Sequence, residues 1–369
     1  MSYLTIILLI FSMLGALDRI AGNRFGLGKE FERAFMLLGT LALSIIGMII
    51  ISPLIAEVAK PLSDILADSF GIDPSIVPSS LFANDMGGAS LSVEMARDEG
   101  IGMFNALVVS ALMGCTISFT IPFALGVVKK EQHKDLFLGL TCGIATIPVG
   151  CFIAGIICGL SLGVLVINLT PLVLFSGIIV AGLLRIPEKV IKIFQILGVF
   201  LKILITVGLM LGIAAFLSGK ELISGIGTFE EGATVCLTIA VVLSGAFPLM
   251  NVLARMLEKP LNRVAHRIGI NETSVVGTMS CLASSAITFG MMEKMDRKGV
   301  VMNSAFAVSA AFSVGSHLAF TMAFDESYVL PVIVGKLTAG VLALILAHVV
   351  YERSCCMRHP ITQRDSRKK

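Results

Sequence analysis

The pair Asn84-Asp85, followed by Gly87-Gly88, is the strongest candidate for chemistry in this chain, because it lies in a polar stretch of an otherwise apolar sequence. A carboxylate at membrane depth is costly, and when present it usually faces a cavity or an opposite charge. The two glycines let the backbone turn or approach a ligand closely. Asp85 is therefore predicted to hold a cation. An Asp also suits the cap of a following half-helix, and the two roles can coexist.

A second polar stretch repeats the position of the first about 199 residues later. Residues 75–94 (SIVPSSLFANDMGGASLSVE) are matched by residues 274–293 (SVVGTMSCLASSAITFGMME), and Lys60-Pro61-Leu62 returns as Lys259-Pro260-Leu261. The second stretch has no central acid, and its hydroxyls come from Ser280, Ser284, Ser285 and Thr288. Small hydroxyl residues also serve as helix-packing contacts. As a cluster opposite Asp85, they are expected to form the neutral half of a site for a small polar ligand.

Several single residues extend this candidate site. Each polar stretch ends in a glutamate, Glu94 or Glu293. Each glutamate can contact the substrate, or it can be solvated at the membrane interface or form a local ion pair. The spans that follow contain Asn105 and Asn303, and His317 lies in the middle of the second one. A buried histidine is often a core residue, and it can also confer pH sensitivity. The predicted substrate-binding set is Asp85, Asn84, Phe82, Ser284, Ser285, Asn105, Asn303, Glu94 and His317.

The aromatic content limits what the ligand can be. The chain has no tryptophan and three tyrosines, which argues against an aromatic cage for a quaternary ammonium. Phe82 beside the first polar centre can still give a weak cation–π contact. These features suit a small primary amine. Lys336, inside an apolar run, is expected to snorkel or to pair with an acid.

The elements that position these residues must be membrane helices. The chain has 369 residues, of which 56% are hydrophobic and 14% charged, with a mean hydropathy of +0.94. Soluble domains carry about 25% charged residues. We therefore expect an all-α polytopic membrane protein with one membrane domain, residues 1–352, and a basic cytoplasmic tail, residues 353–369.

Apolar runs of about 20 residues predict the membrane spans. Nine are expected, near residues 3–18, 35–55, 101–128, 135–159, 163–184, 193–217, 232–254, 300–323 and 328–350. No basic residue precedes the first run, and Arg19 and Arg24 follow it. It therefore reads as a retained span with its N-terminus outside, rather than as a cleavable signal peptide.

The distribution of basic residues decides how the two polar stretches are arranged. If both stretches re-enter the membrane instead of crossing it, the loops between the spans alternate between the two sides of the membrane. Lys60, Arg97 and Lys220 are then the basic residues of the outside loops, and the C-terminus is cytoplasmic. The first repeat, roughly 3–159, is then inverted relative to the second, roughly 193–350, with a linking helix at 163–184. Inverted repeats with broken helices are the usual basis of alternating access.

Some functions are disfavoured by missing motifs. The sequence contains no G-x-x-x-x-G-K-[ST], H-E-x-x-H or G-x-S-x-G motif, so we expect no enzyme, no cofactor and no metal site. Most of the eight cysteines lie inside apolar helices, lack ligand spacing and are expected to be packing residues, while Cys355-Cys356 is expected to belong to an ordinary tail beside the membrane, with acylation as the alternative. The basic tail is expected to anchor the topology, not to bind nucleic acid.

The opening MSYLTIILLIFSMLGALDRIAGNRFGLGKEFERAFMLLGTLALS and the segment SSLFANDMGGASLSVEMA resemble the EutH family, the ethanolamine permeases of bacterial ethanolamine-utilisation operons. The resemblance runs over essentially the whole chain. It implies a multi-pass protein of the bacterial inner membrane that carries ethanolamine into the cytoplasm, where ethanolamine ammonia-lyase consumes it. It assigns no binding residues.

Three functions remain open at this point. The first is a facilitator or secondary carrier for protonated ethanolamine, built as a homo-oligomer by analogy with elevator-type carriers. The second is a channel-like pore for small amines. The third is a membrane receptor that senses ethanolamine. A carboxylate together with Ser, Thr and Asn groups would match the ammonium and the hydroxyl of this ligand.

Overall fold

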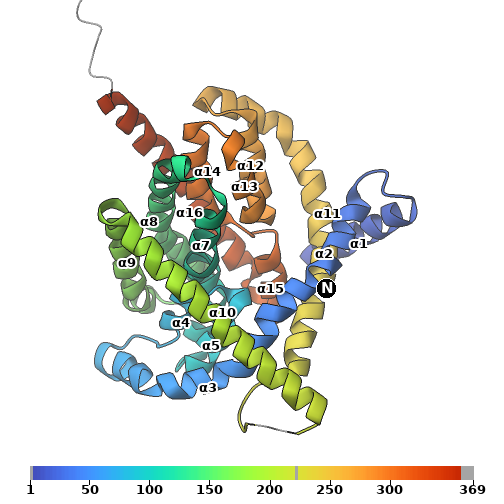
Figure 1. The fold of residues 1–369 in the computed structure, drawn as a ribbon, viewed down its shortest axis with the longest axis vertical. Helices are drawn as coiled ribbons and strands as arrows, with labels where there is room; N and C mark the ends of the chain where they lie inside the picture. Colours follow the sequence, from blue (N-terminus) through green and yellow to red (C-terminus); the bar gives the residue numbers. More distant parts are fainter. Residues whose placement is uncertain (1–2, 221–222, 359–369) are drawn as a thin grey trace, which may run out of the picture.

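The computed structural model describes residues 3–220 and 223–358, apart from the side chains of residues 62, 257–267 and 354–358. All regular structure in these ranges is helical (Figure 1). The α-helices are α1 (Tyr3–Ile20), α2 (Leu27–Met36), α3 (Leu38–Phe70), α4 (Ile76–Leu81), α5 (Gly88–Met95), α6 (Glu99–Phe104), α7 (Ile121–Val127), α8 (His133–Ile157), α9 (Leu162–Arg185), α10 (Pro187–Ser218), α11 (Phe229–Ile268), α12 (Glu272–Ala283), α13 (Ser285–Met291), α14 (Arg297–Ala310), α15 (Ser316–Phe324) and α16 (Val329–Arg358).

Short or widened helical turns complete the chain. The 3₁₀ turns are η1 (Asn84–Met86), η4 (Lys130–Gln132), η5 (Met292–Lys294) and η6 (Glu326–Tyr328), and the π-helical segments are η2 (Asn105–Gly114) and η3 (Thr116–Thr120). The predicted basic tail begins inside α16, and its residues 359–369 lie outside the described residues.

Eight helices of the described chain are long and apolar enough to cross a membrane, where the sequence predicted nine spans. They are Tyr3–Ile20, Leu27–Pro61, Glu99–Val127, Lys130–Ile157, Leu162–Arg185, Pro187–Ser218, Phe229–Met256 and Glu326–Arg353. No single helix of that length covers the predicted span at residues 300–323, because the helix breaks between α14 and α15.

Residues 311–315 form this break. Phe312 has a φ of 62°, a left-handed conformation that bulky residues rarely adopt. The backbone N–H groups of Phe312 and Val314 donate to the carbonyls of Cys281 and Leu282, at 3.1 and 3.0 Å. These bonds to a distant segment replace intrahelical bonds. The apolar pattern could not reveal them, so the prediction of one continuous helix here was wrong.

Both polar stretches fold as two short α-helices joined at a tip, where the α-helix is interrupted. The first pair is α4 and α5, joined through residues 82–87, the first tip. The second pair is α12 and α13, joined at residues 283–286, the second tip. At about 1.5 Å per residue, α4 is about 9 Å long and α12 about 18 Å. No arm alone reaches across a hydrocarbon core of about 30 Å.

The helices gather in two groups. An outer group contains α1, α2, α3, α10 and α11, which pack on one another; α11 runs along one side of the molecule with α1 and α2 beside it (Figure 1). A central group contains α4–α8 and α12–α16, built on mutual contacts among α8, α14 and α16. The chain order α3, α4–α5, α6–α7, α8 returns as α11, α12–α13, α14–α15, α16.

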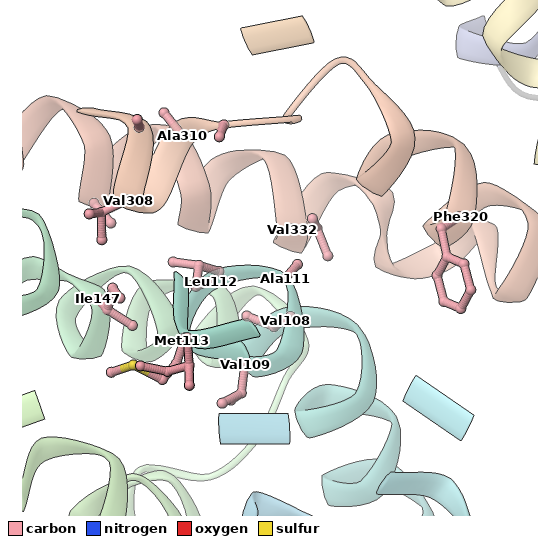
Figure 2. Packing of buried hydrophobic residues seen from close by; sticks show 14 of the residues in the cluster. Val108, Val109, Ala111, Leu112, Met113, Ile147, Val308, Ala310, Phe320 and Val332 are labelled. Carbon is pink, nitrogen blue, oxygen red and sulfur yellow. The ribbon is translucent and has the colours of Figure 1, made fainter. Parts of the chain in front are cut away.

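The apolar core of the central group joins the two halves of the sequence. Val108 and Leu112 of η2 lie close to Val308 of α14 and Val332 of α16, and all four are buried (Figure 2). At Gly150 of α8 there is no side chain to separate its backbone from that of α16, and an added Cβ would meet the Gly335 carbonyl. This tight packing supports the elements that carry both tips.

Candidate functional site

A cavity of about 330 Å³ lies where both tips meet the outer group. The first tip contributes Ala83, Asp85 and Met86, and the second contributes Ala283, Ser284 and Ala286. The remaining lining residues come from the outer group and from the helices behind the tips. They are Arg33, Leu37, Thr40, Leu41, Ser44, Phe247, Cys115, Phe119, Phe312, Ser316 and His317.

Asp85 and His317 face each other in this cavity. The His317 Nε2 lies 3.7 Å from an Asp85 carboxylate oxygen, and both side chains are largely buried. The Ser316 hydroxyl lies close enough to the same carboxylate to interact with it. The predicted cation-binding acid therefore has a titratable partner from the other half of the sequence.

Lys336 of α16 stands behind His317. Its fully buried ammonium donates to the Ala111 carbonyl at 2.6 Å and lies 3.2 Å from His317 Nδ1. An ammonium can only donate, so Nδ1 accepts, and we assign the imidazole proton to Nε2, on the Asp85 side. A chain Lys336–His317–Asp85 thus leads from the protein interior into the cavity.

The break at residues 311–315 places His317. Because α15 begins at Ser316, His317 lies in the first turn of a new helix and not in the middle of a long one. The Phe312 ring stacks on the imidazole, with ring centroids 5.1 Å apart and planes inclined by 29°. The left-handed conformation of Phe312 accompanies this contact. Strained backbone of this kind is often found at functional sites.

Each tip has its open backbone satisfied in a different way. At the first tip, the Ser110 hydroxyl donates to the Phe82 carbonyl at 2.7 Å, and the Ala83 N–H donates to the Ser118 hydroxyl at 3.0 Å. At the second tip, the unwound backbone of residues 312–314 pairs with Cys281 and Leu282. Side chains hold one tip and main chain holds the other.

Asn105 and Asn303 occupy comparable structural positions away from the cavity. Asn105 Nδ2 donates to the Ser75 hydroxyl at 2.8 Å, and Asn303 Nδ2 donates to the Ser274 carbonyl at 2.9 Å. Each bond holds the first residues of a helical pair against the helix that follows it. Neither residue lines the cavity.

Three of the nine predicted residues, Asp85, Ser284 and His317, line the cavity, while the others lie elsewhere. Phe82 packs with Leu91, Met95 and Leu201. Glu94 lies in a separate surface hollow beside Lys60 and Arg97. Asn84 and Ser285 are fully buried, and none of the described atoms is a hydrogen-bond partner of the Asn84 amide or the Ser285 hydroxyl.

Lys336 is the residue that sequence reasoning underestimated. Its signal was a lone lysine within an apolar run, which fits snorkelling as well as burial. Cys115, Phe119, Phe247 and Ser316 gave no signal that separates them from packing residues. Among the described residues, no group of three or more His, Cys, Asp or Glu side chains could hold a metal ion.

A larger hollow of about 450 Å³ lies near α8, α9 and the start of α14. It contains Asp135, which accepts two hydrogen bonds from the Arg297 guanidinium at 2.8 and 3.1 Å. Neither tip contributes to it. We therefore place the candidate site in the smaller cavity, where buried ionisable groups and both helix breaks converge.

These observations define a polytopic helical membrane protein with a largely apolar cavity that contains a buried carboxylate and a histidine. The chain belongs to the family described as "Ethanolamine utilisation protein, EutH", whose family model matches residues 1–350. It is 42% identical to the probable ethanolamine permease EutH of Listeria monocytogenes, over 92% of this chain and 91% of that protein. It is 36% identical to the protein of the same name from Salmonella typhimurium, over 92% and 93%.

A further relative is the uncharacterized protein YxeR of Bacillus subtilis, 36% identical over 92% of both chains. No solved structure matches this chain. The family recognised from the opening segment and from the first polar stretch is thereby confirmed.

Proposed function

We propose that this protein transports protonated ethanolamine across the membrane and binds it in the cavity between the two tips. The observation that carries the proposal is the position of Asp85, a cavity carboxylate among the hydroxyls of Thr40, Ser44, Ser284 and Ser316. Ethanolammonium presents an ammonium at one end and a hydroxyl at the other. A carboxylate binds the first through charge-assisted hydrogen bonds, and Ser or Thr hydroxyls suit the second.

The names of the relatives support ethanolamine as the substrate, because several are called probable ethanolamine permeases. The cavity supports a small cation in its own right. Its lining contains one carboxylate, and the Arg33 guanidinium at its edge is paired with Glu30 at 3.2 Å. This pairing reduces the repulsion that the Arg33 guanidinium would exert on a cation at Asp85.

The proposal includes the membrane arrangement: both helical pairs re-enter the bilayer, and the two repeats are inverted. The short arms, the repeated element order and the distribution of basic residues support it. The cavity lies at the boundary between the outer and central groups. Movement of one group against the other would expose it to each side in turn, as in carriers with alternating access.

Labelled-substrate counterflow into proteoliposomes tests this function. The purified protein should accumulate radiolabelled ethanolamine against preloaded unlabelled ethanolamine, and Asp85→Asn should lower the rate about 10- to 100-fold, since a hydrogen bond to a charged group contributes about 1.5–3 kcal/mol. Glu188→Gln, which removes an exposed carboxylate of α10, is the matched control. Its rate should equal that of the parent.

Two outcomes would contradict the carrier. Flux without counterflow indicates a channel-like pore, and tight binding without flux indicates a receptor. Parental counterflow by Asp85→Asn would remove Asp85 from the binding site while leaving transport intact.

A further inference from the structure

We propose that transport is an exchange of one ethanolammonium for one proton, in which substrate binding at Asp85 expels a proton from the Lys336–His317 pair. The proposal rests on the transport function above and deepens it. It assigns Lys336 a role as a tethered cation that balances Asp85 whenever the substrate is absent.

The groups around Lys336 set up a competition between its ammonium and the substrate ammonium for the Asp85 carboxylate. The groups that act on its ammonium are the thiols of Cys115, Cys151 and Cys281 and the carboxylate of Asp85, with the His317 imidazole in between. Thiols are largely neutral at pH 7. Cys151 lies on α8, which packs against α16, Cys281 lies on α12, and Cys115 lies between η2 and η3. Asp85, at the first tip, is the anion among them.

Binding of a second cation would upset this balance. With an empty cavity, one ammonium at Lys336 offsets one carboxylate at Asp85. With ethanolammonium at Asp85, the site would hold two cations and one anion in a largely buried space. An uncompensated buried charge is strongly disfavoured, and the usual escape is a change of protonation. Release of one proton restores neutrality.

The geometry supplies a route for this proton. The Lys336 Nζ–H bond breaks as an N–H bond forms at His317 Nδ1, which lies 3.2 Å away. The Nε2–H bond then breaks, and its proton passes to cavity water on the Asp85 side. Lys336 is left as a neutral amine and His317 as the other neutral tautomer. When the substrate leaves, water returns a proton along the same path and restores the ammonium.

The wild-type protein tests whether transport is electroneutral, and the Lys336 variants below distinguish the exchange from passage of neutral ethanolamine, which has the same net balance. Proteoliposomes with a trapped pH dye and imposed potassium diffusion potentials should show one proton moving out for each ethanolammonium moving in, after subtraction of the flux in protein-free liposomes. Because the exchange is electroneutral, substrate accumulation should not change with a 100 mV potential. A carrier of ethanolammonium alone would change its accumulation about 40-fold.

Two substitutions of Lys336 separate its charge from its ability to lose a proton. Lys336→Met removes the tethered cation, so transport should become driven by membrane potential and release no proton. Lys336→Arg keeps a charge that proteins do not deprotonate. Its affinity for ethanolamine should therefore fall at least tenfold and its counterflow should be lost, while it still elutes as a monodisperse protein. Lys202→Met, at an exposed lysine of α10, is the control and should keep wild-type coupling.

Two results would overturn the exchange alone. One is wild-type counterflow that follows the membrane potential without proton movement. The other is proton-coupled exchange that persists in Lys336→Arg, the variant that decides the matter if Lys336→Met does not fold. Absence of any counterflow by the wild type would overturn the proposed carrier and the exchange together.

Discussion

His317 lies between the two ionisable groups on which the proposed exchange depends. Its Nδ1 lies 3.2 Å from the Lys336 ammonium, and its Nε2 lies 3.7 Å from the Asp85 carboxylate. An imidazole can take a proton on one nitrogen and give one up from the other. The two ring nitrogens of His317 face these two groups, so the imidazole suits a position that protons cross.

His317→Gln tests this role. Glutamine keeps a donor and an acceptor at this place, but it cannot pass a proton, so ethanolamine affinity should stay within about threefold of the parent while exchange slows at least tenfold. Calorimetric binding and proteoliposome exchange measure the two effects separately. His133→Gln, at a half-buried histidine outside the cavity, is the matched control. A parental exchange rate in His317→Gln would contradict the relay.

At the scale of elements, the site depends on two places where the backbone behind a tip passes very close to it. A Cβ added at Gly114 would meet the Phe82 carbonyl of the first tip, and one added at Gly315 would meet the Ala283 carbonyl at the second. Glycine is needed at both because the neighbouring atoms are backbone and cannot rotate away. These contacts fix the distance from each tip to the helix behind it.

Gly114→Ala and Gly315→Ala should therefore displace the tips. Overpacking of this kind costs about 1–3 kcal/mol, so both variants should melt at a lower temperature and transport at least tenfold more slowly. Gly198→Ala on α10 adds a Cβ that meets no atom within 4 Å, and it should melt at the same or a higher temperature. Thermal melting and counterflow measurements on the three variants test these expectations. Parental transport by Gly315→Ala would show that the second tip tolerates the shift.

At the scale of the whole molecule, the outer and central groups meet around the cavity and are joined by ion pairs at their ends. Arg97, which follows the first helical pair, reaches Asp68 and Asp64 of α3 at 2.5 and 2.6 Å. These bonds, that to Asp68 above all, raise the pKa of the Arg97 guanidinium. Movement of the central group against the outer one would have to break or stretch these exposed contacts, which are individually weak.

Cysteine labelling in oriented membrane vesicles tests the proposed arrangement across the bilayer. If each helical pair re-enters, the residues on its two sides share one face of the membrane. Lys60→Cys and Glu99→Cys, which flank the first pair, should react with an impermeant maleimide from outside. Glu272→Cys and Lys294→Cys, which flank the second, should react from inside. All four positions are exposed.

The parent chain, with its native cysteines, provides the background for this labelling. Reaction of Lys60→Cys and Glu99→Cys from opposite sides would show that the first pair crosses the bilayer. Reaction of all four positions from one side would show that the repeats are not inverted.

The sequence by itself determined the helical membrane class, most of the spans and the family, and it predicted Asp85 as a site residue. Apolar composition and run length are local properties that decide which segments can lie in lipid, so they can be read from the chain. A carboxylate among glycines within such a chain stands out for the same reason. The opening segment and the first polar stretch carried enough identity to indicate the family.

Only the tertiary structure decided what surrounds Asp85. His317 and Lys336 are more than 200 positions away, and their approach depends on the packing of α8, α14 and α16. The break at Phe312 also depends on carbonyls of a distant segment, at Cys281 and Leu282. Hydrogen bonds and charge pairs between remote segments leave no local pattern in the sequence. The role of a lone lysine in an apolar helix could therefore be inferred only from the groups that the fold places around it.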